Sequence, residues 1–209
     1  IAILSENCAH WIIADLAIMM SDHISVPLYP TLQNEVVKYC LEHSESKILF
    51  VGKAPKWEEQ KKVVSKTIKK IHFPFWEKEG CENWEDVIEN IQPVTKNYIP
   101  KLSDLVTIIY TSGTTGMPKG VMHHYKAFAF AATALLEEIN NLGLLTEHER
   151  FLSFLPLSHI AERMLVEMGG LYAGAPISIA ESIEKMPENL RDTQPTVFLA
   201  VPLIWTRMQ

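Results

Sequence analysis

An α/β fold with largely parallel sheet layers is the architecture that this chain of 209 residues predicts. Short apolar, β-branched segments alternate with amphipathic segments along the whole chain, as strands and helices do in βαβ units. Such alternation is typical of parallel sheets with helices on their faces. The hydrophobic content of 47% and the charged content of 21% suit a globular protein with a sizeable core.

The first part of the chain predicts successive strand–helix units. Val37, Cys40 and Leu41 share one face of a predicted helix. Pro27 and Pro30 place the strand beside them at a sheet edge or a strand end. The expected strands are residues 2–4, 24–29, 47–51 and 71–76, and the expected helices are residues 9–20, 34–43 and 84–91.

Two segments in the middle of the chain are less regular. Residues 53–70 contain seven lysines and two glutamates. A basic patch for phosphate or membrane is one interpretation, and a solvated helix face is the one we favour. Residues 92–104, which include Pro93 and Pro100, indicate a connector and a candidate subdivision of the domain.

The second part of the chain continues the alternation. A strand is predicted at residues 105–110, whose β-branched side chains suit a buried position. An alanine-rich helix is expected next, over residues 125–140, and is closed by Gly143. Further strands are expected at residues 151–155, 177–180 and 196–201.

The most informative segment follows the predicted strand at 105–110 and reads Thr111-Ser112-Gly113-Thr114-Thr115-Gly116-Met117-Pro118-Lys119-Gly120. Glycines just beyond a strand let the backbone turn sharply and present its N–H groups to an anion. Hydroxyl groups and a lysine ammonium add side-chain donors to the same oxygens. The segment therefore predicts a polyphosphate site.

The spacing excludes two common nucleotide motifs. Pro118-Lys119-Gly120 stands where the Walker pattern requires Gly-Lys-Ser/Thr, and Gly113 and Gly116 are wrongly spaced for Gly-x-Gly-x-x-Gly. The segment resembles instead the phosphate-binding loop of the acyl-adenylate-forming enzymes, which include acyl-CoA synthetases, luciferases and peptide-synthetase adenylation domains. The alternative interpretation is an ordinary polar surface turn.

A second informative segment, Leu155-Pro156-Leu157-Ser158-His159-Ile160-Ala161-Glu162-Arg163, follows the expected strand at 151–155. Ligands bind beyond the carboxyl ends of strands in open α/β sheets. His159 is a candidate for contact with a substrate carboxylate, although a histidine in such a place is often structural. Glu162 and Arg163 are expected to form at most a surface ion pair of little energetic weight.

Leu-Pro-Leu-Ser-His followed by Glu-Arg is similar to the long-chain fatty acyl-CoA synthetase branch of that family. Residues 26–31, 44–51 and 194–202 carry the same similarity, which spans nearly the whole chain and is weakest over residues 53–100. We therefore expect residues 1–209 to be part of the large N-terminal AMP-binding domain, truncated at both ends. The family's adenine-binding, ribose-binding and C-terminal lysine residues are expected beyond Gln209, so this chain alone is expected to be inactive.

The resemblance implies ATP-dependent activation of a long-chain fatty acid to an acyl-adenylate and then to an acyl-CoA. ATP and CoA are the implied co-substrates, and Mg²⁺ is the implied metal. Lys119, Thr114 and Thr115 are the implied catalytic residues, Thr111 the Mg²⁺ contact and His159 a residue of the acyl pocket. The implied nucleotide-binding residues are Thr111, Ser112, Gly113, Thr114, Thr115, Gly116 and Lys119.

Two other functions stay open, namely an adenylation domain that loads a carrier protein and a non-catalytic nucleotide-binding module. The net charge of −6 argues against nucleic acid as a partner. Cys8, Cys40 and Cys81 lie far apart, which predicts a reducing, cytoplasmic compartment. The most apolar early stretch, residues 11–20, is too short to span a bilayer, while peripheral membrane contact and oligomeric state stay open.

Overall fold

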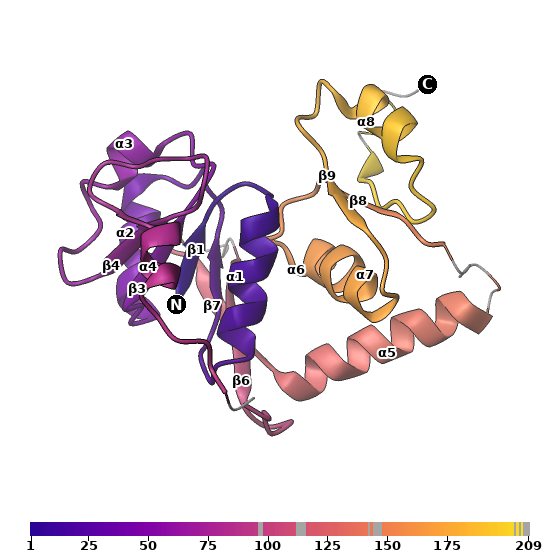
Figure 1. Ribbon diagram of the computed structural model, residues 1–209, viewed down its shortest axis with the longest axis horizontal. Coiled ribbons are helices and arrows are strands. Elements are labelled where there is room, and N and C mark those ends of the chain that lie inside the picture. The colour runs from indigo at the N-terminus through magenta and orange to yellow at the C-terminus, as the bar shows by residue number, and fades with distance from the viewer. Residues whose placement is uncertain are drawn as a thin grey trace. The chain divides into compact units, whose positions relative to one another are not determined.

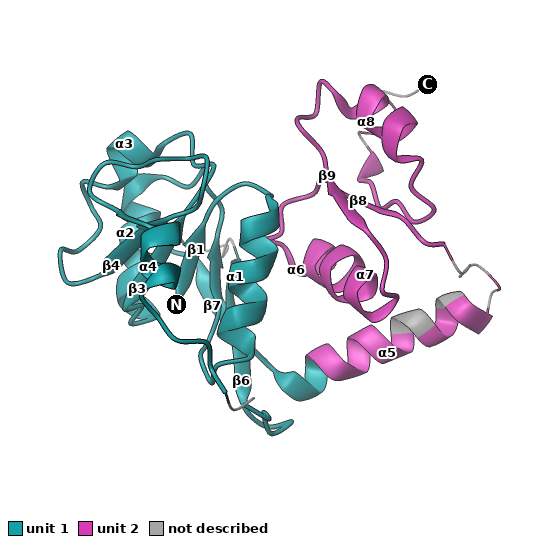
Figure 2. Ribbon diagram, viewed as in Figure 1, with its two compact units in different colours: residues 1–127 teal, residues 128–209 magenta. Residues whose placement is uncertain are grey.

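The computed structural model describes residues 1–95, 98–111, 116–141, 143, 148–202, 204 and 206, without the side chains of residues 135, 136 and 139. The chain divides into two compact units, residues 1–127 and 128–209 (Figure 2). The connector at 92–104 therefore lies inside the first unit.

The first unit is built on a five-stranded parallel sheet (Figure 1). The strand order is β2-β1-β3-β4-β5, and every neighbouring pair is parallel. The strands are β1 (Ala2–Leu4), β2 (Val26–Leu28), β3 (Ile48–Val51), β4 (Lys69–His72) and β5 (Glu82–Asn83). The helices α1 (Ala9–Met19), α2 (Asn34–His43) and α3 (Trp57–Gln60) lie between successive strands in the chain, and α4 (Trp84–Glu89) follows β5.

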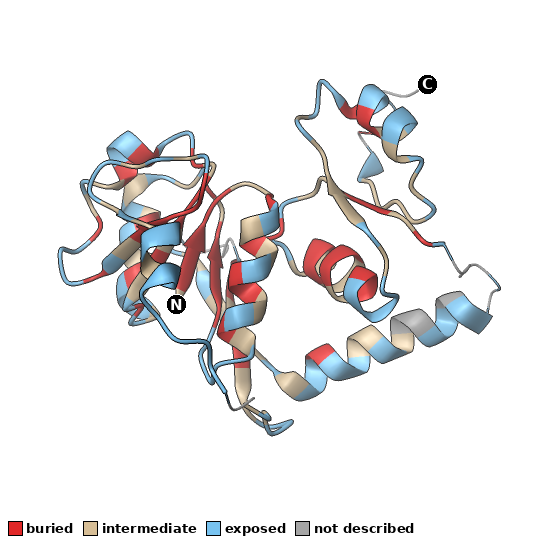
Figure 3. Cartoon of the chain, viewed as in Figure 1, coloured by how far each residue is buried: buried red, intermediate tan, exposed pale blue. Residues whose placement is uncertain are grey.

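Apolar side chains explain why these elements pack. The central strands β1 and β3 alternate with helices along the chain, and the apolar faces of these helices are buried. Figure 3 shows the sheet as the most buried part of this unit. Helix α2 buries Val37, Cys40 and Leu41, which confirms the predicted helical face. Trp11 and Trp57 are fully buried and add large apolar surfaces to the core.

The lysine-rich segment differs from the expectation of a solvated helix. Only the four residues of α3 are helical, and the segment continues in turns as far as β4. Trp57 and Gln60 of α3 are buried, and Gln60 donates hydrogen bonds to the carbonyl oxygens of Pro30 and Leu32 at 3.0 and 2.9 Å. None of the seven lysines is buried, and none lies within α3 itself.

A hairpin completes the first unit. Strand β6 (Leu105–Thr111) pairs antiparallel with β7 (Lys119–His124), and helix α5 (Tyr125–Asn141) begins directly after it. The strand at β7 was not predicted, and His123 and His124 belong to it. A parallel bridge joins Thr107 of β6 to Ser25, the residue before β2, so β6 runs in the direction of the five-stranded sheet. The Ile108 amide donates to the Ser25 carbonyl at 3.0 Å.

The second unit contains a short parallel pair of strands, β8 (Phe151–Ser153) and β9 (Ile177–Ile179). Between them lie α6 (Ile160–Glu162), a π-helical stretch η1 (Arg163–Met168) and α7 (Gly169–Tyr172), and α8 (Met186–Thr193) follows β9. The strand expected at 196–201 is wrong, because within those described residues only Val197 forms an isolated bridge, to Phe151.

Two adjacent glycines in α7 differ in what surrounds them. A Cβ at Gly170 would lie 2.7 Å from Cγ1 of Ile177 in β9, whereas at Gly169 the nearest atom beyond the adjoining helical turn would be 3.6 Å away. We expect Gly170→Ala to lower the free energy of unfolding by about 1–3 kcal/mol through overpacking. Gly169→Ala, the matched control, is expected to be neutral or to stabilise by up to about 1 kcal/mol. Chemical denaturation of both variants measures the difference, and equal stabilities would contradict the packing seen here.

Candidate functional site

The predicted polyphosphate loop lies between the two strands of the hairpin. Strand β6 ends at Thr111 and β7 begins at Lys119, and these two residues face each other in the ladder. Ser112, Gly113, Thr114 and Thr115 lie outside the described residues. Of the predicted loop residues, the structure therefore places Thr111, Gly116 and Lys119, and it brings the hydroxyl and the ammonium to the same end of one hairpin.

Gly116 has a backbone conformation that suits a tight loop. Its φ is +113°, in the region where L side chains are strained, and a Cβ there would meet no heavy atom within 4 Å. A larger side chain would have room at this position, so it is the backbone conformation that favours glycine here. This is consistent with a loop whose backbone, rather than its side chains, approaches a ligand.

The base of the loop is anchored by Tyr110. Its hydroxyl shares a 2.8 Å hydrogen bond with His43 Nδ1 and donates to the Cys40 carbonyl at 3.3 Å. Burial raises the pKa of the Tyr110 phenol to about 12, so it remains neutral and keeps donating. Gly120 lies against it, because a Cβ there would be 2.9 Å from Cγ2 of Ile108 and 3.3 Å from the Tyr110 ring. Sequence reasoning missed this anchor, since its partners lie about 70 residues earlier in the chain.

Thr111 and Lys119 are both exposed, as a site for a charged ligand requires. A threonine hydroxyl can bind Mg²⁺ or a phosphate oxygen, and a lysine ammonium supplies a compact positive charge. Mg²⁺ commonly takes only one or two protein ligands together with substrate phosphates. Among the described residues no group of three or more His, Cys, Asp or Glu side chains is placed to hold a metal.

The other predicted site residue, His159, lies in the second unit. It precedes α6, and its Nδ1 accepts a hydrogen bond from the Ala161 amide at 3.2 Å. The side chain is exposed, so capping of the helix occupies one ring nitrogen without burying the imidazole. His159 belongs to the unit of residues 128–209, whereas the hairpin loop belongs to the unit of residues 1–127.

Glu162 and Arg163 are not a surface ion pair, and this prediction is wrong. Glu162 is 1% exposed and Arg163 is fully buried. Arg163 lies 3.7 Å from the buried carboxylate of Glu167 and sits over the Phe128 ring at 5.2 Å from its centre. The misprediction arose because adjacent charged residues normally lie at the surface, whereas here tertiary packing covers both.

The Glu162 carboxylate forms a hydrogen bond with the residue that follows the preceding strand, β8. Its Oε1 accepts a 2.9 Å hydrogen bond from the Phe154 amide, directly after β8. Burial raises the pKa of this carboxyl to about 7, while hydrogen bonds from the Ser153 hydroxyl and the Phe154 amide act in the opposite direction. A glutamate inside an otherwise apolar helical pattern is the signal that would have indicated burial.

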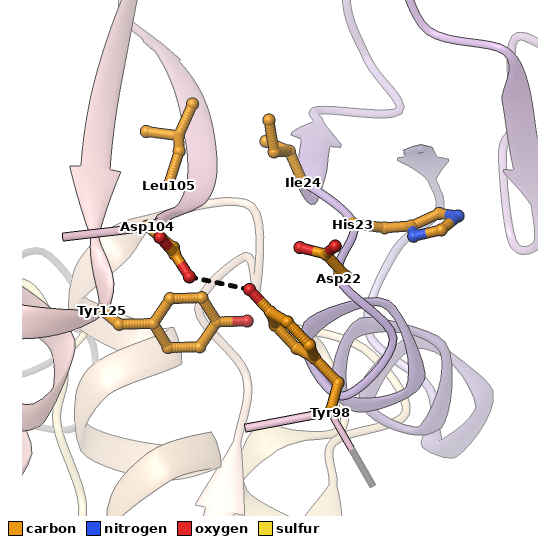
Figure 4. A pocket seen from close by; sticks show the side chains of 7 residues that line it. All are labelled: Asp22, His23, Ile24, Tyr98, Asp104, Leu105 and Tyr125. Carbon is orange, nitrogen blue, oxygen red and sulfur yellow. Dashed lines mark hydrogen bonds between the residues drawn. The ribbon is translucent and has the colours of Figure 1, made fainter. Parts of the chain in front are cut away.

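A separate pocket of about 230 Å³ lies at the other end of β6, beside Leu105 (Figure 4). The Tyr98 hydroxyl donates a 2.7 Å hydrogen bond to Asp104 Oδ2, and the Asp22 carboxylate lies on the other side of the same hydroxyl. The hydrogen bond to Asp104 raises the pKa of Tyr98 well above its usual range, with Asp22 adding to the effect. This acidic pocket does not suit the phosphates of a nucleotide, and it shares no residue with the predicted loop.

A family model described as AMP-binding enzyme matches residues 1–209. The chain belongs to the AMP-binding enzyme family. Within it, the chain is 28% identical to the long-chain-fatty-acid–CoA ligase ACSBG2 of Homo sapiens over its full length and over 33% of that protein. It is 32% identical to long chain acyl-CoA synthetase 5 of Arabidopsis thaliana over 97% of this chain and 33% of that protein. The chain thus spans about a third of the length of these curated relatives.

Solved structures of adenylate-forming enzymes have the same fold. The anthranilate CoA ligase AuaEII in complex with anthranoyl-AMP matches with a TM-score of 0.83 at 22% identity, over 98% of this chain and 40% of that one. The o-succinylbenzoate CoA synthetase of Bacillus subtilis in complex with ATP and magnesium matches with a TM-score of 0.77 at 23% identity, over 99% and 40%. The predicted α/β fold of such an N-terminal domain is confirmed. No helix within the described ranges has the length and apolar character needed to cross a bilayer.

Proposed function

We propose that the protein containing this chain activates a long-chain fatty acid with ATP and transfers the acyl group to CoA. In the first step a carboxylate oxygen attacks the α-phosphorus of ATP, and the bond to pyrophosphate breaks. In the second step the thiol sulfur of CoA attacks the acyl carbon, and AMP leaves. The observation that carries the proposal is the hairpin in which Thr111 and Lys119 face each other across the loop.

The chemistry of the first step explains why such a loop is needed. A carboxylate is a weak nucleophile and ATP is strongly negative, so the two must be positioned together while charge builds on the leaving pyrophosphate. In the proposal Lys119 neutralises that charge, and the backbone and hydroxyl groups of residues 112–116 hold the phosphates. Mg²⁺, when bound, supplies further positive charge, with Thr111 as the residue that would hold it.

The acid side of the proposal depends on His159. Its imidazole is exposed directly after the loop that follows β8, where it is available to a carboxylate or to the wall of an acyl pocket. The preference for long-chain acids rests on the identity with long-chain acyl-CoA ligases, of which the chain spans about a third. Small molecules, rather than nucleic acid, are therefore the proposed partners.

A cytoplasmic location belongs to the same proposal, with peripheral membrane contact left open. Cys8, Cys40 and Cys81 are free thiols in the structure. Burial raises the pKa of Cys40 to about 12 and that of Cys81 to about 11, so both stay protonated and weakly reactive. Unpaired thiols of this kind suit a reducing compartment.

Carboxylate-dependent ATP–pyrophosphate exchange tests the function. The full parent protein and the 209-residue chain are assayed side by side with acids from acetate to long-chain fatty acids. We expect exchange by the parent only, and the fastest exchange with long-chain acids. Exchange with only short, aryl or amino acids would contradict a long-chain fatty acid as the substrate. Loading of a carrier protein in place of CoA would contradict CoA as the acceptor. ATP binding without exchange for any acid would favour a non-catalytic module.

A further inference from the structure

The segment between β8 and α6 is closed on itself by one buried carboxylate. Phe154 is the first residue after β8, and Glu162 is the last residue of α6. The 2.9 Å hydrogen bond from the Phe154 amide to Glu162 Oε1 joins these two points, so residues 154–159 form a loop with both ends fastened. The Glu162 side chain thus fastens the loop at the strand end.

The burial of Glu162 explains why its carboxyl group needs this hydrogen bond. A carboxyl group that is 1% exposed loses its hydration, and the loss is tolerated only when protein donors replace water. The nearby ion pair of Arg163 and Glu167 is a separate arrangement one turn further on, inside the π-helical stretch. In Figure 3 these helical turns are drawn largely as buried. Glu162 therefore bonds to the end of β8, whereas Glu167 pairs with Arg163.

The loop determines where His159 points. The His159 amide donates to the Pro156 carbonyl at 2.8 Å, and the Arg163 amide donates to the His159 carbonyl at 3.2 Å. The imidazole also accepts from the Ala161 amide. The backbone N–H of His159 is thus bonded to the loop and its carbonyl to the helix. A shift of residues 154–158 would therefore move the imidazole with them.

We propose that Glu162 is a positioning residue for the acid substrate, because its bond to Phe154 holds the 154–159 loop and thereby His159 in place. This inference rests on the proposed function, in which His159 contacts the acid. Glu162 does not touch the substrate and acts only through the loop. Loss of the bond therefore raises KM for the acid and leaves KM for ATP unchanged.

Three variants of the full parent protein test this role. Glu162→Ala removes the acceptor and is expected to raise KM for the fatty acid about tenfold, the size of one lost buried hydrogen bond, with KM for ATP unchanged. Glu162→Gln keeps an acceptor oxygen for the Phe154 amide and is expected to restore KM to within about twofold. Glu167→Gln, a control at another buried glutamate, is expected to reduce stability without shifting KM for the acid.

Hydrogen exchange of the same proteins provides a readout that does not depend on activity. Residues 154–159 should exchange faster in Glu162→Ala than in the wild type, and at the wild-type rate in Glu162→Gln. An unchanged KM for the acid in Glu162→Ala, or equal changes in both KM values and kcat, would overturn the positioning role while leaving the proposed function intact. A wild-type protein without any exchange of pyrophosphate would overturn the proposed function and the role together.

Discussion

Replacing Lys119 with alanine in the full parent protein is expected to lower carboxylate-dependent ATP–pyrophosphate exchange by about 100- to 1,000-fold, the usual effect of removing one group that stabilises transition-state charge. Lys119 is exposed at the first position of β7, opposite Thr111. Since pyrophosphate carries most of the charge that develops in the first step, loss of the ammonium should lower kcat more than it raises KM for ATP.

Two further variants make this result specific. Lys126→Ala removes the same charge from an exposed position near the start of α5 in the same unit and should leave the exchange rate within about twofold. Lys119→Arg keeps the charge but changes the shape of the donor, so it should recover part of the activity. Steady-state exchange with saturating acid measures all three, and equal losses for Lys119→Ala and Lys126→Ala would contradict a phosphate role for Lys119.

The second large effect concerns the pH dependence of stability. Glu162 has an ordinary pKa of 4.5 when the chain is unfolded and a pKa of about 7 when it is folded, because burial disfavours its charge. The folded state therefore holds this proton more tightly. The stabilisation is fully present below pH 4.5, falls as the pH rises, and is lost above about pH 7, with a total of about 3 kcal/mol.

The Glu162→Gln variant has no proton to lose at this position and should lack that decrease. The free energy of opening at β8, from hydrogen exchange of residues 151–153 corrected for intrinsic rates, measures it in both proteins between pH 4.5 and 8. The difference between wild type and variant should change by about 3 kcal/mol across that range. Parallel pH profiles for the two proteins would show that Glu162 ionises in the folded state as it does in the unfolded one.

Local pattern was sufficient for much of the fold. The helix predicted at 34–43 is confirmed at both ends, and the helices that begin at residues 9 and 84 differ from the prediction by no more than two residues at their ends. These elements were predictable because their apolar periodicity and their neighbouring prolines act within a few residues. The glycine, hydroxyl and lysine residues from Thr111 to Lys119 predict a phosphate loop from sequence alone, and that role stays a prediction.

Other features depended on partners that are distant in the chain. The segment 119–124 alternates polar and small residues too weakly to predict a strand, and it becomes one because β6 supplies its hydrogen bonds. The segment 196–201 looked like a strand and forms only one bridge, through Val197. Strand pairing decided both cases, as it usually does when the local preference is small.

The sequence by itself determined the α/β class and the order of most elements, because these follow from periodicity. It also predicts a phosphate loop from residue type, and that role stays a prediction. Only the tertiary structure revealed that Tyr110 anchors the loop through His43, and that Glu162 is buried against the end of β8. Burial and pKa are set by everything that surrounds a side chain, so two adjacent charged letters could not show that both would lie inside the protein.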